Sequence, residues 1–121
     1  MSRKRPRVTD YLDHIRAAIE RIERYTAGLE YESFVQSDIA QDAVVRNLEI
    51  IGEACRNIAR IDPDFAARHP DFPLKAALEM RNVLVHGYFG VDLEIVWRTI
   101  RTNLPPMRRQ VEAIIAELGR D

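Results

Sequence analysis

Apolar residues recur every three or four positions along most of this 121-residue chain, and this spacing constrains its fold more than any other feature. Such a period places apolar side chains along one face of an α-helix. No segment alternates convincingly with period two, the pattern of a half-buried strand, and no internal repeat is visible. We therefore expect an all-α fold, an up-down bundle of four to five helices.

Turn-forming and capping residues divide this pattern into segments. Serine, threonine, asparagine and aspartate favour helix starts, whereas glycine and proline favour helix ends. The predicted helices run from Thr9 or Asp10 to about Gly28, from Ser37 or Asp38 to Asp62-Pro63, from Leu74 to about Val85, and from Asp92 toward the C-terminus. Residues 31–36 are predicted to form a short turn. In the last segment, Pro105-Pro106 either kinks the helix or begins a new one.

The second of these helices is the longest and carries a continuous apolar stripe. Its predicted members are Ile39, Ala43, Val44, Leu48, Ile51, Cys55 and Ile58. Cys55 is the only cysteine, which excludes an internal disulfide and leaves no metal-ligand spacing. We interpret it as a core thiol.

The length of the chain suits one domain. Residues 1–7 hold four cations in five positions and are predicted to be a disordered basic arm, which leaves residues 8–121 as a single helical domain. The arm could touch RNA phosphates, but such arms are more often solvated tails. The whole chain has 18 basic and 19 acidic residues and a net charge of −1, so any contact with nucleic acid must be local.

The composition is ordinary for a soluble globular protein. No apolar run approaches the roughly 18 residues that a membrane-spanning helix requires. The N-terminus also lacks the apolar core of a signal peptide. We therefore expect a cytoplasmic protein without a membrane partner.

The stretch from Met80 to Tyr88 places four chemically useful groups in an otherwise apolar run. Arg81 is permanently charged, and its planar fork suits a phosphate. Asn82 supplies an amide beside it. His86 titrates near neutrality and could act as a general acid or base. Tyr88 offers a hydroxyl that can be modified. The stretch is therefore the candidate functional site.

The spacing of these residues constrains how they can cooperate. On a continuous helix with about 100° per residue, Tyr88 would lie about 20° from Arg81, but His86 would lie about 140° away. Gly87 and Gly90 indicate that the helix ends near His86. An end there would allow His86 and Tyr88 to turn back toward Arg81 or toward a second subunit.

The same residues also have a purely structural interpretation. Arg81 could pair with a carboxylate, and His86 could donate a hydrogen bond to a backbone carbonyl. The candidate carboxylates lie along the longest predicted helix and are Asp38, Asp42, Glu49 and Glu53. We expect these four residues to be ordinary surface charges, although pairing with Arg81 would hold its side chain in place and weaken a free phosphate site.

At these residues the chain resembles the HEPN superfamily and, within it, the HepT-like toxins. The family is marked by an arginine, four residues, a histidine, one residue and a tyrosine, which are here Arg81, His86 and Tyr88. Asn82 matches the polar residue that often follows the arginine. The resemblance extends to residues 41–54 and 80–97 and covers residues 8–118 in all.

This resemblance implies a metal-independent endoribonuclease that acts as a toxin, needs no cofactor for cleavage and forms a homodimer with the motif at the subunit interface. It also implies a cognate nucleotidyltransferase antitoxin that uses Mg-ATP to attach AMP to the motif tyrosine, here Tyr88. A higher hetero-oligomer with that partner is left open.

RNA can be cleaved when its 2′-hydroxyl attacks the adjacent phosphate. Arg81 would stabilise the charge that develops on the phosphorane, and His86 would supply one proton transfer. One histidine cannot obviously fill both proton roles at once, but a dimer that joins two motifs could. Asn82 would orient a neighbouring group or the phosphate. No ligand cluster that would hold a metal ion is visible in the sequence.

Two further interpretations remain open. Tyr88 is either a packing residue of the interface or an exposed target, where an attached AMP would place a competing anion in the phosphate site. The protein as a whole could instead be a binding module that docks the nucleotidyltransferase without catalysis, or a helical dimer whose motif only stabilises the interface.

Overall fold

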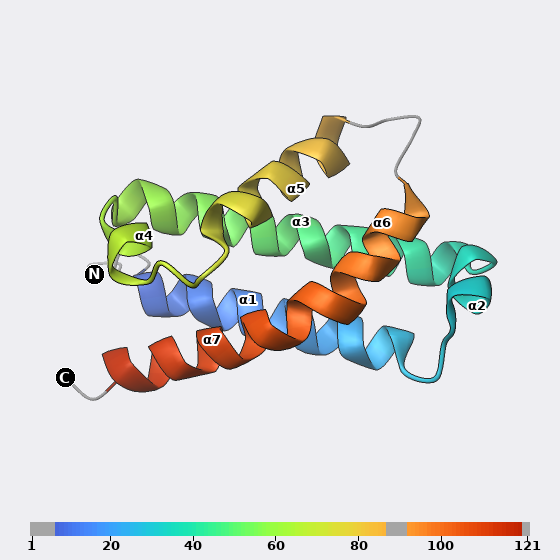
Figure 1. Cartoon of the computed structure of the whole chain (residues 1–121), viewed down its shortest axis with the longest axis horizontal. Helices are drawn as coiled ribbons and strands as arrows, with labels where there is room; N and C mark the ends of the chain where they lie inside the picture. The colour runs from blue at the N-terminus through green and yellow to red at the C-terminus, as the bar shows by residue number, and fades with distance from the viewer. Residues whose placement is uncertain (1–6, 87–91, 120–121) are drawn as a thin grey trace, which may run out of the picture.

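The computed structural model describes residues 7–86 and 92–119, and for residues 83, 85 and 86 it describes the backbone alone. This part of the chain is helical and contains no strand, which confirms the all-α class (Figure 1). In chain order the helices are α1 (Val8–Thr26), α2 (Tyr31–Val35), α3 (Asp38–Ile61), α4 (Phe65–Arg68), α5 (Leu74–His86), α6 (Leu93–Arg98) and α7 (Leu104–Leu118), with a π-helical turn (Thr99–Asn103) between the last two.

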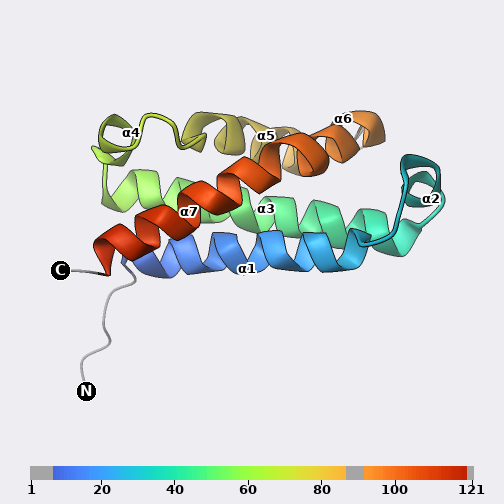
Figure 2. The same cartoon turned by 60° about the horizontal axis from the view of Figure 1, so that its bottom comes forward.

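The long helices α1 and α3 run antiparallel and form the centre of the bundle (Figure 1). Helix α7 packs on α1, and α5 packs on α3, whereas the short helices α2 and α4 lie at opposite ends of the bundle (Figure 2). The apolar faces that the sequence predicts meet in one core. Its largest fully buried side chains are Phe34, Phe65, Leu12, Ile15, Ile19, Ile22, Ile58, Val44, Val96, Val111 and Cys55.

Polar contacts fix the pairing of α1 with its two neighbours. Arg21 on α1 donates from Nε to Oδ1 of the buried Asn47 on α3, at 2.7 Å. Asn47 in turn donates to the backbone carbonyl of Ala43, at 2.8 Å, so the amide is satisfied on both sides. At the other contact, Arg108 on α7 forms ion pairs with two carboxylates of α1.

Helix starts follow the capping residues of the sequence, with one difference. Ser37 accepts a hydrogen bond from the backbone N–H of Ala40 at 3.1 Å, and Asp92 accepts one from Glu94 at 3.0 Å, as predicted. Helix α1, however, begins at Val8 and not after Thr9 or Asp10. Asp10 lies inside its first turn and accepts a hydrogen bond from the backbone N–H of Arg7, at 2.7 Å. A carboxylate at this position can reach back to the start of the helix, so the acidic residue marks the third helical position.

Two predictions for the region around the start of α3 were wrong. The turn expected at residues 31–36 is the short helix α2, because the buried Phe34 anchors it. The Phe34 ring lies 5.2 Å from the Trp97 ring, centroid to centroid, which ties α2 to α6. Ile39, expected in the apolar stripe of α3, is 85% exposed. It lies in the first turn of α3, where the buried face begins with Ala40.

The proline pair was predicted either to kink a helix or to begin a new one, and in the structure it lies at the start of a new helix, α7. Pro105 and Pro106 occupy the first turn of α7, where a missing N–H costs no helical hydrogen bond. The carbonyls of Arg101 and Thr102, four residues before each proline, cannot receive the usual α-helical bond. The chain therefore passes through the wider π-helical turn before α7 starts.

Other predictions fall wholly or partly outside the described residues. The basic arm at residues 1–7 is described only at Arg7, so its disorder and the domain boundary beside it stay predictions. Within the described ranges, no helix combines the length and the apolar character that crossing a membrane would require.

Cys55 provides a test of the core. The side chain is fully buried, and burial raises the pKa of the thiol from its usual value near 9 to about 12. Because only the thiolate reacts readily, iodoacetamide at about pH 8 should leave the native protein unmodified and should alkylate it quickly in denaturant, as followed by intact mass. The unfolded chain releases the thiol proton first, so this group's contribution to stability should fall as the pH rises from about 9 to about 12. Fast alkylation of the native protein would show that Cys55 is accessible.

Candidate functional site

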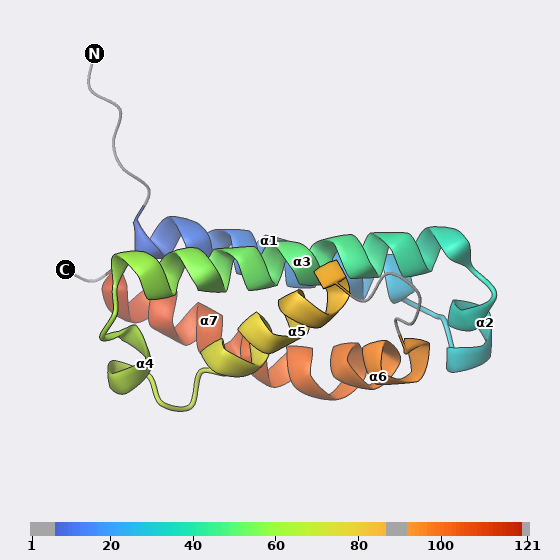
Figure 3. The ribbon, with the colours of Figure 1, turned by 90° about the horizontal axis from the view of Figure 1, so that it is seen from above.

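The site is built on a close approach of α3 and α5, and α5 crosses α3 obliquely (Figure 3). Gly52 lies in the middle of α3 at the point of contact. A Cβ added there would lie 2.3 Å from Cβ of Arg81 and 3.2 Å from the carbonyl oxygen of Ala77. Only a glycine allows the stem of Arg81 to rest directly on the α3 backbone.

Sequence reasoning gave Gly52 no role, although a signal was present. A glycine in the interior of a helix costs roughly 0.5–1 kcal/mol relative to alanine. Gly52 interrupts an otherwise strong helical stretch of 24 residues. A glycine in such a place indicates a close backbone approach, but the sequence does not say which segment approaches.

Arg81 forms an ion pair with the residue that follows this glycine. Its Nε lies 3.1 Å from Oε2 of Glu53, and the two side chains are 24% and 46% exposed. The expectation that all four acidic residues of α3 would be ordinary surface charges was therefore wrong for Glu53. The reason is position, because Glu53 stands beside the point where α3 and α5 touch.

The other three carboxylates do not pair with Arg81 among the described residues. Asp38 and Asp42 are exposed. Glu49 lies 3.9 Å from Arg46 on its own helix, a loose surface pair.

Arg81 and Asn82 share one surface pocket of about 360 Å³, which is also lined by Leu78 and Arg56. Asn82 is exposed, so its amide is open to solvent beside the guanidinium. The structure thus brings together two of the residues that the motif singled out. It adds Arg56 from α3, a residue that sequence reasoning missed because nothing in the sequence alone places it beside the motif.

The remaining motif residues are only partly described. Helix α5 is continuous from Leu74 to His86, in agreement with the predicted helix end. His86 is thus five residues after Arg81 on one helix, a rotation of about 140° around the axis. Its side chain and the whole of Tyr88 lie outside the described residues, so their roles stay predictions.

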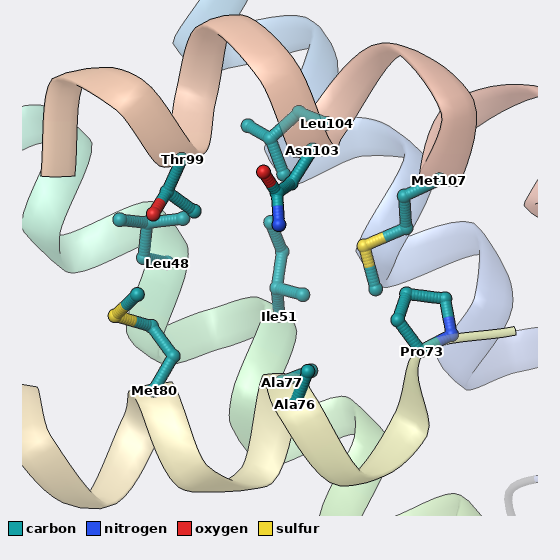
Figure 4. A pocket seen from close by; sticks show the side chains of 10 residues that line it. All are labelled: Leu48, Ile51, Pro73, Ala76, Ala77, Met80, Thr99, Asn103, Leu104 and Met107. Atoms are coloured by element: carbon teal, nitrogen blue, oxygen red, sulfur yellow. The ribbon is translucent and has the colours of Figure 1, made fainter. Parts of the chain in front are cut away.

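A second cavity lies on another face of α5 and differs in character (Figure 4). Its volume is about 110 Å³, and apolar side chains of α3, α5 and α7 line most of it, among them Ile51, Met80 and Leu104. Thr99 and Asn103 are its polar members, and both come from the π-helical turn. The cavity contains no titratable side chain, so proton transfer has no group to use there.

Among the described residues, no three His, Cys, Asp or Glu side chains gather where they could hold an ion. The polar side chains that line the Arg81 pocket are cationic and amide donors, which suit a phosphate or another oxyanion.

Comparison with known proteins finds the same family that the motif resembles. Residues 15–114 match the family described as Ribonuclease HepT-like. The chain is 41% identical over 105 residues to the "Probable ribonuclease HepT" of Thermococcus cleftensis, a match that covers 87% of this chain and 93% of that protein. It is 38% identical over 105 residues to a "Putative RNase" of Caldanaerobacter subterraneus subsp. tengcongensis, covering 87% and 91%. No solved structure gives a significant match.

The contact at Gly52 can be tested by adding one methyl group. In an unobstructed helix interior, Gly→Ala stabilises by about 0.5–1 kcal/mol. Because the new Cβ would meet the Arg81 stem, we expect Gly52→Ala instead to lower the free energy of unfolding by about 1–3 kcal/mol, as overpacking does. Chemical denaturation followed by circular dichroism measures the change. An unchanged or higher stability would show that α3 and α5 separate without cost.

Proposed function

This chain belongs to the HepT-like ribonuclease family, and we propose that it is a metal-independent endoribonuclease that acts as the toxin of a toxin–antitoxin system. The observation that carries the proposal is the open pocket that Arg81 and Asn82 share, in a chain whose relatives are named ribonucleases. The pocket offers donors for a phosphate at the surface, where an RNA strand can reach them.

In the proposed reaction, the 2′-hydroxyl of the RNA attacks the adjacent phosphorus, and the bond to the 5′-oxygen breaks. Arg81 stabilises the negative charge on the phosphorane, a contribution that is often the largest in such sites. A guanidinium has five N–H donors, so the pairing of Nε with Glu53 leaves donors for the phosphate. Asn82 orients the phosphate beside it.

His86 carries one proton transfer in this proposal, either from the 2′-hydroxyl or to the leaving 5′-oxygen. The rotation between Arg81 and His86 along α5 supports a shared site between two copies of the chain, in which His86 of one copy serves Arg81 of the other. We therefore propose a homodimer as the active form. Two histidines at one cleft would also provide both the base and the acid.

The proposed regulation is covalent. The Tyr88 hydroxyl attacks the α-phosphorus of Mg-ATP bound to the nucleotidyltransferase antitoxin, a P–O bond forms, and pyrophosphate leaves with the phenolic proton taken up by solvent or a base. The attached AMP places a phosphate and a base seven residues after Arg81, where it competes with RNA.

An alternative function is a non-catalytic dimer that docks the nucleotidyltransferase. The observation in its favour is that Arg81 is already engaged by Glu53 and packed on Gly52. In this version Arg81 maintains the α3–α5 contact, and no RNA is cut.

Cleavage of total RNA in excess EDTA separates the two functions. We expect the unmodified wild type to cleave and His86→Ala to lose activity by about 10²–10⁴-fold, the usual worth of a general acid or base. Both proteins should be purified identically, shown to be folded and free of AMP. Cleavage by His86→Ala at the wild-type rate would remove His86 from the mechanism, and cleavage by neither would favour the docking dimer.

Glu53 is proposed to position Arg81, and kinetics can distinguish this role from a structural one. Glu53→Gln removes the negative charge beside Arg81, so RNA should bind more tightly and KM should fall. The guanidinium is then held less firmly, so kcat should fall by about tenfold, in line with the cost of small misplacements. Glu79→Gln, which removes one charge from the exposed face of α5, is the matched control and should change neither constant. A proportional loss of active protein, with KM unchanged, would indicate a structural role alone.

A further inference from the structure

The Arg81 pocket has a charge balance that the motif does not reveal. Arg81 and Glu53 carry opposite charges 3.1 Å apart, so together they present almost no net charge to an approaching anion. A phosphate that meets this pair alone gains the hydrogen bonds of the guanidinium, but repulsion from the carboxylate offsets part of its attraction to Arg81. A further cation in this pocket would therefore strengthen phosphate binding.

Arg56 is such a cation. It lines the same pocket from α3, is exposed, and among the described residues its side chain has no ion pair or hydrogen bond. Arg56 lies one helical turn after Gly52, on the α3 surface that faces α5, so the close helix contact that seats Arg81 also brings Arg56 to the pocket.

We propose that Arg56 binds a backbone phosphate of single-stranded RNA, next to the phosphate held by Arg81 and Asn82. The inference rests on the proposed ribonuclease function and assigns to that site a second phosphate contact from α3. A guanidinium suits this task because its planar fork can donate two parallel hydrogen bonds to phosphate oxygens.

The proposal explains how a chain with a net charge of −1 can bind a polyanion. Each neutralised phosphate releases counterions, which makes the affinity depend on salt. Two neighbouring arginines provide such contacts without a basic surface over the whole domain. The charge of Arg81 is partly balanced by Glu53, whereas, among the described residues, that of Arg56 is not.

The test measures binding of a 2′-O-methyl RNA oligonucleotide, which lacks the attacking hydroxyl and cannot be cut, as a function of salt concentration. We expect Arg56→Gln to bind about tenfold more weakly than wild type at low salt. The slope of log K against log[salt] should become smaller by about 0.7, the value for one lost contact to a single strand. Arg56→Lys should keep the slope, because it keeps the charge, and should bind less tightly than wild type.

The matched control is Arg109→Gln, which removes the same charge from an exposed position on α7, a helix that does not line the pocket. A wild-type slope in Arg56→Gln, or an equal loss of affinity in Arg109→Gln, would overturn the proposal.

Cleavage of unmodified RNA by wild type distinguishes this failure from that of the proposed function. If wild type cleaves RNA but Arg56→Gln binds the oligonucleotide as wild type does, the Arg56 contact alone is refuted. If binding depends on Arg56 but no RNA is cleaved, the contact stands and the nuclease is refuted.

Discussion

The contact between α3 and α5 at Gly52 is the constraint on which the candidate site depends. A backbone without a Cβ allows the Arg81 stem to lie against α3, and this in turn brings Glu53 within 3.1 Å of the guanidinium and Arg56 to the edge of the same pocket. Any larger side chain at this position would push the helices apart. The cost of a glycine inside a long helix is thus offset by a contact that organises several side chains of the candidate site at once.

That contact also determines the electrostatics of the pocket. Glu53 pairs with Arg81, and its negative charge offsets part of the attraction that Arg81 would exert on a phosphate. In the proposed site, Arg81 is held in position to stabilise the reacting phosphate, and Arg56 adds attraction for the neighbouring phosphate. Such a division suits a site that must bind an anion tightly enough to orient it and still release the product.

Much of the fold follows from local physical chemistry that the sequence displays directly. The period of the apolar residues predicted helices, and Ser37 and Asp92 capped them as expected, because capping depends only on neighbouring residues. The failures came where tertiary contacts decided. Residues 31–35 form a helix because Phe34 is buried against Trp97, a contact across more than sixty positions that no local pattern encodes.

The same division holds for the site. The sequence by itself determined the all-α class, the approximate helix boundaries, the family and the adjacency of Arg81 and Asn82, since these depend on residue spacing within one segment. Only the tertiary structure decided which carboxylate pairs with Arg81, that Gly52 contacts the Arg81 stem, and that Arg56 lines the same pocket. These facts depend on the register between α3 and α5, which is set by side-chain packing across the helix interface and is not written in the spacing of either helix.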